Sequence, residues 1–316
     1  MKRLQILIAF LLFATFAAAS EPANVPPVLA TLTLPYSTVL PGVPFDMTVT
    51  LKNASGKTVS AGAMARLSIK LPDGASYESG STTPLEPCDP SEPDSTIELA
   101  PGASVDRVIT WLPYQHTWTS DGRYTGPGVY QVTLELVAGR RDVPSSYIGP
   151  LRTNSVRLER AVAPGEDAEI WQKMLSVSNG VWSDNGFARL KAGLELAKEI
   201  TETHVTSGYY PYALLLTSTT QGKDAIAPLL DAAERFQSSP AHPYLLKQAA
   251  DCAFREANQA AWFRDDEKSA REYYTRAGEL FQRAIKTSSL AVRAGSERGQ
   301  HDAANAQQKL RPRQKE

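Results

Sequence analysis

The chain has 316 residues, of which 42% are hydrophobic, and it carries 33 basic and 34 acidic side chains. This length allows two domains of roughly 100–200 residues each, and the composition is that of a folded globular protein. The near-neutral charge gives no electrostatic basis for nucleic-acid binding, which depends on a clustered excess of Lys and Arg.

Residues 1–19 have the three-part layout of a secretory signal peptide. Lys2 and Arg3 form a basic start, an apolar run extends from Leu4 to Phe16, and three alanines precede Ser20. The run is too short for a spanning helix, which needs about 20 apolar residues. We therefore expect export, cleavage near Ser20, and a periplasmic or extracellular mature chain with no transmembrane segment.

Residues 20–162 are expected to form strands and turns. Apolar and polar residues alternate in six runs, which are Ala30–Leu34, Phe45–Leu51, Ala65–Leu71, Val105–Trp111, Val129–Leu136 and Ser155–Leu158. Proline, glycine and asparagine punctuate the connections, as in Pro41-Gly42 and Asn53–Gly56. About seven strands with no helical pattern between them are typical of an immunoglobulin-like antiparallel β-sandwich.

Two short motifs in this region carry a resemblance. Pro41–Asn53 resembles the strand-turn start of bacterial immunoglobulin-like modules, and Gly126–Leu134 is similar to their last strand. The Cys…Trp…Cys core of antibody domains is missing, so the resemblance implies the architecture only.

Residues 163–292 change to a helical period. The expected helices begin with Pro164–Val177 and continue with Phe187–Ile200, Tyr209–Thr219, Lys223–Phe236, Pro243–Phe263 and Glu267–Thr287. Short breaks between them favour antiparallel helical hairpins. After Gly295 no continuous apolar face is visible, so residues 293–316 are expected to be a flexible basic tail.

An internal echo in the helical region indicates repeats. Pro211–Leu215 and Pro243–Leu246 are similar and are spaced by 32 residues, close to the 34-residue tetratricopeptide period. Gln248–Ala261 with Ala270–Ala284 resembles one tetratricopeptide helix pair, although the full consensus is absent. The order of leader, sandwich and helical repeats resembles that of uncharacterised exported bacterial proteins.

No catalytic motif is present in the sequence. It lacks G-x-S-x-G, H-E-x-x-H, a phosphate-binding glycine loop and G-x-G-x-x-G. The acids Glu166, Asp167 and Glu169 are explained by a helix start, where the helix dipole favours negative charge. We expect a protein that is not an enzyme and has no cofactor or metal site. Cys88 and Cys252 could form one disulfide, but a loop thiol and a buried helical thiol are the favoured interpretation.

Two aromatic clusters are the candidate binding residues. Tyr114, His116 and Trp118 would share one face of an extended segment, where they could stack on a sugar or seat a peptide. Tyr209, Tyr210 and Tyr212 form a second cluster. For both clusters the alternative is ordinary packing, because most aromatic side chains are buried hydrophobes.

The sequence therefore predicts a non-catalytic exported interaction or scaffold protein, which binds a protein or peptide partner through its helical repeats. The alternative is that the aromatic cluster of the sandwich binds carbohydrate or another envelope polymer. Exposure distinguishes the two, because binding through Tyr114, His116 and Trp118 requires all three to face solvent.

Overall fold

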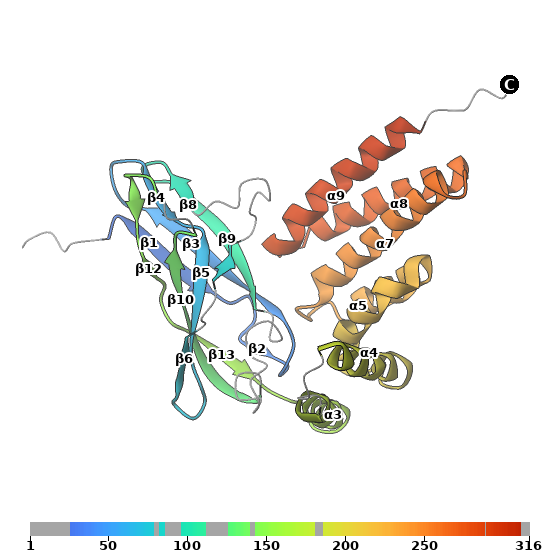
Figure 1. The fold of residues 1–316 in the computed structure, drawn as a ribbon, viewed down its shortest axis with the longest axis horizontal. Coiled ribbons are helices and arrows are strands. Elements are labelled where there is room, and N and C mark those ends of the chain that lie inside the picture. The colour runs from blue at the N-terminus through green and yellow to red at the C-terminus, as the bar shows by residue number, and fades with distance from the viewer. Residues whose placement is uncertain are drawn as a thin grey trace, which may run out of the picture.

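The computed structural model describes residues 26–78, 82–85, 96–111, 126–139, 143–180, 186–287 and 289–310. An N-terminal β half is followed by a C-terminal helical half, and Figure 1 shows the two lying next to each other. The predicted change from strands to helices near residue 163 is confirmed. The predicted signal peptide lies outside the described residues.

The described strands of the β half form three sheets. One has the order β1 (Val28–Thr33), β3 (Phe45–Asn53), β9 (Ser104–Trp111). The largest has the order β2 (Thr38–Val39), β13 (Val156–Arg160), β10 (Gly128–Val137), β5 (Met64–Lys70), β6 (Ser76–Glu78), with β7 (Thr83–Pro84) on β5 and β12 (Leu151–Arg152) on β10. The third has the order β11 (Tyr147–Ile148), β4 (Val59–Gly62), β8 (Thr96–Leu99). All pairs are antiparallel except β11 with β4 and β13 with β2.

Alternation along the strands builds the core of the β half. In β3 every second side chain from Phe45 to Asn53 is buried, and β10 buries Tyr130, Val132, Leu134 and Leu136 in the same way. Successive side chains of a strand point to opposite faces, so one face of each strand lies against the core. The six alternating runs predicted as strands are confirmed as β1, β3, β5, β9, β10 and β13.

Asn53 at the end of β3 ties the first sheet to the third. Its amide nitrogen donates to the carbonyl oxygens of Lys57, Leu99 and Ala100 at 2.8, 2.9 and 3.0 Å. Its side-chain oxygen accepts from the Ser55 backbone N–H at 2.8 Å. A fully buried amide needs such partners, which explains why asparagine ends this alternating run.

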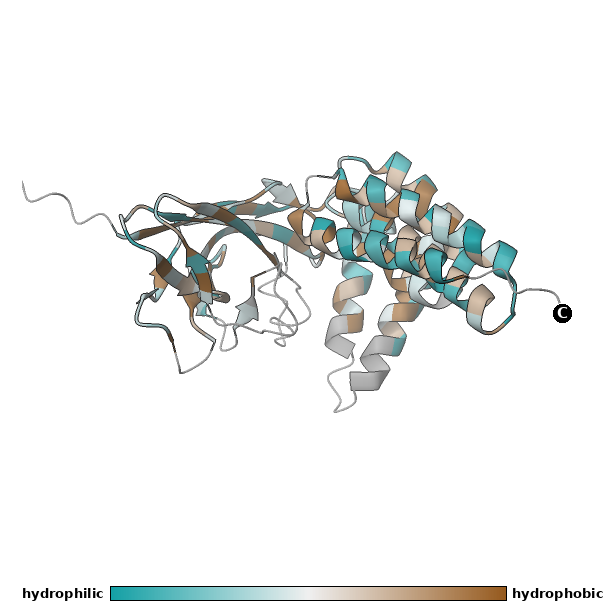
Figure 2. Ribbon diagram, turned by 90° about the horizontal axis from the view of Figure 1, so that it is seen from above, coloured by the Kyte–Doolittle hydropathy of each residue, from teal (hydrophilic) through white to brown (hydrophobic). Residues whose placement is uncertain are grey.

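The helical half contains seven α-helices and one short 3₁₀ helix among the described residues. They are α3 (Glu166–Gly180), α4 (Gly186–Thr203), α5 (Tyr210–Gln221), η1 (Gly222–Ala225), α6 (Ile226–Arg235), α7 (His242–Trp262), α8 (Glu267–Ile285) and α9 (Leu290–Lys309). Figure 1 shows them stacked in chain order from α3 to α9, and Figure 2 shows the two halves end to end with many hydrophilic residues along the helices. In this described part no helix combines the length and hydrophobicity needed to cross a bilayer.

Small residues let α7, α8 and α9 approach closely. Alanines fill half of the buried positions of α7, and α8 buries Ala270, Ala277 and Ala284. Asp266 caps α8 by accepting from the Ser269 backbone N–H at 3.0 Å. The expected helix pair over Gln248–Ala261 and Ala270–Ala284 is present as α7 and α8.

The structure corrects the boundary that we predicted for the tail. Residues 290–309 form α9, with Ser289 as its N-cap and Val292, Ser296 and Ala303 buried. Our criterion was a continuous apolar face, whereas α9 packs through small residues such as Gly299, which touches Phe281. Gly and Ala score low as hydrophobes but permit close helix packing, so this helix was missed.

Candidate binding site

The two halves meet through a carboxylate of β3. Asp46 accepts hydrogen bonds from Thr110 in β9 at 2.7 Å and, across the junction, from the hydroxyls of Tyr244 at 2.5 Å and Ser289 at 2.9 Å. Burial and the neighbouring Asp46 charge raise the pKa of Tyr244, which keeps its hydroxyl protonated as a donor. One carboxylate therefore joins the β half to α7 and to the start of α9.

A second contact involves the turn between β2 and β3. Gly42 has φ of +74°, and a Cβ there would lie 3.0 Å from Met174 Cε and 3.1 Å from Trp171 Cζ3. Glycine is required here for two reasons. A left-handed backbone conformation disfavours any residue with a side chain, and helix α3 leaves no room for a Cβ atom. The hydroxyl of Tyr209 donates to the carbonyl oxygen of Pro41 at 3.2 Å and fixes the turn from the other side.

An apolar pocket lies between this turn and helices α3, α4 and α5. Its volume is about 230 Å³. The turn contributes Gly42, Val43 and Pro44, and the helices contribute Met174, Val177, Gly193, Leu196, Ala197, Ile200, Tyr209, Tyr212, Ala213 and Leu216. Apart from the two tyrosine hydroxyls, the named side chains are apolar, so the pocket suits an apolar group.

The three tyrosines predicted as a binding cluster take different places. Tyr209 and Tyr212 line the pocket, and burial raises the pKa of both hydroxyls, which therefore stay neutral. Tyr210 points elsewhere: its ring stacks on Phe236 with centroids 5.9 Å apart, beneath the Arg235 guanidinium at 5.5 Å. Packing accounts for Tyr210, whereas Tyr209 is buried and Tyr212 half-buried, and both also line a cavity.

Arg160 at the end of β13 places a buried cation behind these tyrosines. Its guanidinium carbon lies 5.6 Å from the Phe45 ring centroid and 5.8 Å from that of Tyr130. Burial lowers the pKa of Arg160 to about 10, and the neighbouring Tyr130 opposes that shift most strongly. Arg160 therefore remains charged at neutral pH, with its charge facing aromatic rings.

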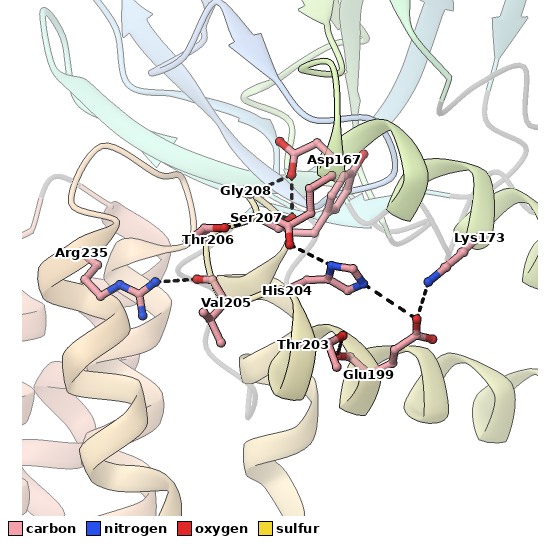
Figure 3. A network of polar contacts seen from close by, with 12 residues as sticks. Asp167, Lys173, Glu199, Thr203, His204, Val205, Thr206, Ser207, Gly208 and Arg235 are labelled. Atoms are coloured by element: carbon pink, nitrogen blue, oxygen red, sulfur yellow. Dashed lines mark hydrogen bonds and ion pairs between the residues drawn. The ribbon is translucent and has the colours of Figure 1, made fainter.

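A polar network fixes the segment that precedes Tyr209 (Figure 3). Asp167 in the first turn of α3 accepts from the Ser207 hydroxyl at 2.6 Å and from the Gly208 backbone N–H at 2.9 Å. Ser207 in turn accepts from the Tyr209 backbone N–H at 3.0 Å. These bonds hold the chain at the start of α5 and so set the position of Tyr209 in the pocket wall.

His204 links the same segment to α3 and α4. Its Nδ1 lies 2.8 Å from Glu166 Oε1 and its Nε2 lies 3.8 Å from Glu199 Oε1. Figure 3 shows His204 and Lys173 approaching Glu199 from different sides, and Lys173 forms an ion pair with it. The hydrogen bond from His204, followed by that from Thr206, lowers the pKa of Glu166. The hydrogen bond from Lys173 likewise lowers the pKa of Glu199.

A histidine beside two carboxylates has the elements of acid–base chemistry, yet the bonds found here serve structure. Ser207, three residues after His204, is bonded to Asp167 and to backbone rather than to the imidazole. A nucleophilic serine needs hydrogen-bond contact with its base. The network is therefore best explained as a brace for the pocket wall.

Sequence reasoning found part of this site. The cluster at Tyr114, His116 and Trp118 lies outside the described residues and stays a prediction. Tyr209 and Tyr212 were found by their aromatic character. The pocket residues Leu196, Ile200 and Leu216 were missed, and the proline-glycine turn was noted only as a turn. The helical spacing of Leu196, Ile200 and Leu216 indicates a buried helix face. The spacing does not show that this face borders a pocket.

The described residues also bear on metal and redox chemistry. Within the ranges given above, no three His, Cys, Asp or Glu side chains gather in a way that could hold a metal ion. Cys252 is a free, buried thiol in α7, as the favoured interpretation had it, and burial raises its pKa. Cys88 lies outside the described residues.

Comparisons with known proteins assign no family. No family model matches the chain, and no curated protein matches it. Among solved structures, a Pseudomonas fluorescens alkylpurine DNA glycosylase, AlkC, bound to DNA is 14% identical with a TM-score of 0.28, and the alignment covers 48% of this chain and 33% of the glycosylase. The Bacillus subtilis sporulation control protein Spo0M is 13% identical with a TM-score of 0.28, over 48% of this chain and 55% of Spo0M. A CARDB domain from Pyrococcus furiosus, in complex with metal ions, is 13% identical with a TM-score of 0.24, over 43% of this chain and 93% of the domain. This chain thus spans about a third of the glycosylase, and likenesses this weak carry no argument about function.

Proposed function

We propose that this chain is a non-catalytic, exported binding protein, in which an immunoglobulin-like β-sandwich supports tetratricopeptide-like helices that receive a protein or peptide partner. The observation that carries the proposal is the apolar pocket between the Gly42 turn and helices α3, α4 and α5. The leader-like residues 1–19 support export, and the stacking of the helices in chain order supports the repeat assignment.

The size of the pocket favours one side chain of a partner over a cofactor. A dry apolar cavity of roughly 150 Å³ is large enough to bind benzene, whereas pockets for drug-sized ligands span about 300–1,000 Å³. At about 230 Å³ this pocket takes one aromatic or long aliphatic side chain. Burying such a side chain contributes about 1.5–3 kcal/mol, which is typical of an anchor residue in a peptide complex.

The pocket wall is also held in advance of binding. Tyr209 is fixed by its bond to Pro41 and by the bonds of Ser207 and Gly208 to Asp167. A preformed site lowers the entropy cost of binding. This arrangement supports recognition through one rigid anchor point.

The test is peptide display on the mature chain from Ser20, followed by affinity measurement of the selected peptides. Leu216 at the pocket rim and Val205 outside the pocket are both 41% exposed, so Leu216→Arg and Val205→Arg form a matched pair. We expect peptides with an apolar anchor whose affinity falls at least about tenfold in Leu216→Arg and stays unchanged in Val205→Arg. Failure to select peptides, or equal effects of both substitutions, would contradict the proposal. Retention on isolated envelope polysaccharide instead would favour the carbohydrate alternative.

A further inference from the structure

A second cavity lies between Tyr36 of the β half and helices α7 and α8. Its volume is about 380 Å³. Its wall includes Tyr36 from the segment between β1 and β2, His242, Pro243 and Leu246 from the first turns of α7, and Arg283 and Lys286 from the end of α8. It shares no residue with the apolar pocket.

The charge of this cavity is one-sided. Arg283 and Lys286 are exposed, and neither has an ion pair or hydrogen bond with any side chain in the described part of the chain. No acidic residue belongs to the described wall. Asp46 is near enough to Tyr36 to affect its pKa, but its oxygens already accept from Thr110, Tyr244 and Ser289. Two cations therefore line the cavity, and no carboxylate among its described wall residues pairs with them.

His242 adds a third polar group to the wall. Its Nδ1 lies 2.9 Å from the carbonyl oxygen of Ala233. A carbonyl only accepts, so Nδ1 carries the hydrogen, and this bond fixes the imidazole ring in the cavity wall. Burial, and then the Asp46 charge, raise the pKa of Tyr36, so its phenol remains a neutral hydrogen-bond donor. Pro243 and Leu246, both buried, supply an apolar floor.

We propose that this cavity binds a small organic oxyanion, in which a carboxylate or phosphate group is attached to an apolar body. Arg283 and Lys286 neutralise the anion, because guanidinium and ammonium groups are the usual partners of carboxylate and phosphate. Tyr36, Pro243 and Leu246 contact the body. The volume falls within the roughly 300–1,000 Å³ typical of small-molecule sites. This proposal is independent of the peptide site.

The test uses calorimetric titration of the full mature chain with benzoate and with phenyl phosphate, and with benzamide as the neutral match of benzoate. Arg283→Gln/Lys286→Gln removes both cations from the cavity. Lys268→Gln/Arg276→Gln changes the same net charge at exposed positions of the same helix and is the matched control. Thermal melting of both double variants verifies that they fold.

We expect at least one of the two anions to bind, benzamide to bind at least about tenfold more weakly, and the cavity variant to lose at least about tenfold in affinity. The control variant should stay within about twofold. Absence of binding by both anions, equal binding of benzamide, or equal loss in both variants would overturn the proposal. A peptide ending in a free phenylalanine carboxylate, compared with its C-terminal amide, separates the two sources of the anion. Tighter binding of the free acid than of benzoate identifies a peptide terminus, and the reverse identifies a small metabolite.

Discussion

The core of the β half is filled by large side chains, whereas α7, α8 and α9 combine large side chains with many buried alanines. Phe45, Met47, Leu134 and Leu136 are almost wholly buried in the first region. In the second region, half of the buried positions of α7 are alanine. The core of the β half depends on the volume that its side chains fill. The packing of α7, α8 and α9 depends on the short distance between helices that small side chains permit. Truncation should therefore damage one region and enlargement the other.

The largest effect is expected from truncation in the β half. Leu134 is fully buried in β10, opposite Leu67 of β5. Leu134→Ala removes buried apolar surface and leaves a cavity, so we expect a loss of about 2–5 kcal/mol in the free energy of unfolding, measured by urea denaturation. Gln131→Ala, at an exposed position of the same strand, should change it by less than about 0.5 kcal/mol. A loss below 1 kcal/mol in Leu134→Ala would mean that this core can collapse around the gap.

The same contrast explains what could be predicted from the sequence. Period-two alternation located β3 and β10, because large apolar residues on one face give a strong signal. The strand β4 was missed because all four of its residues, Val59–Gly62, are buried, so it shows no alternation. The helix α9 was missed because Val292 is the one large apolar residue among its buried positions, the others being Ser296 and Ala303, with Gly299 against Phe281.

The candidate site could be predicted only in part for a related reason. Tyr209 and Tyr212 are conspicuous as residues, but the pocket arises where the Gly42 turn meets α3, α4 and α5. Nothing in the local sequence states which turn packs on which helices. Arg283 and Lys286 are likewise recognisable as cations in the sequence. That they line a cavity wall with no acidic residue depends on the tertiary arrangement, which the local sequence does not show.

Enlargement within the helical half should have an intermediate effect. A Cβ added at Gly299 of α9 would lie 2.4 Å from Phe281 Cζ, whereas one added at Gly278 of α8 would meet nothing within 4 Å. We expect Gly299→Ala to cost about 1–3 kcal/mol through overpacking, although alanine favours the helix itself. Gly278→Ala should stabilise by about 0.5–1 kcal/mol, since it gains helix propensity without a clash. Equal shifts in thermal midpoint for both variants would show that α9 does not rely on close approach.

The smallest effect concerns α3 and α4, where polar contacts supplement packing. Binding to His204 and Thr206 lowers the pKa of Glu166 in the folded chain, so the fold favours the ionised carboxylate. The stabilisation is present above the ordinary glutamate pKa of about 4.3 and is lost as pH falls through the lowered value. Glu166→Gln should therefore lower the thermal midpoint at about pH 6, and its difference from the unaltered protein should shrink as the pH falls below the ordinary glutamate pKa of about 4.3. Glu169 lies in the same helical turn, but its carboxylate has no partner among the described residues. The difference in thermal midpoint between Glu169→Gln and the unaltered protein should therefore not depend on pH in this way. If the difference in thermal midpoint for Glu166→Gln persisted unchanged at low pH, the lost stability would come from the changed side-chain contacts and not from the carboxylate charge. The α3–α4 contact would then depend on packing, as the two cores do.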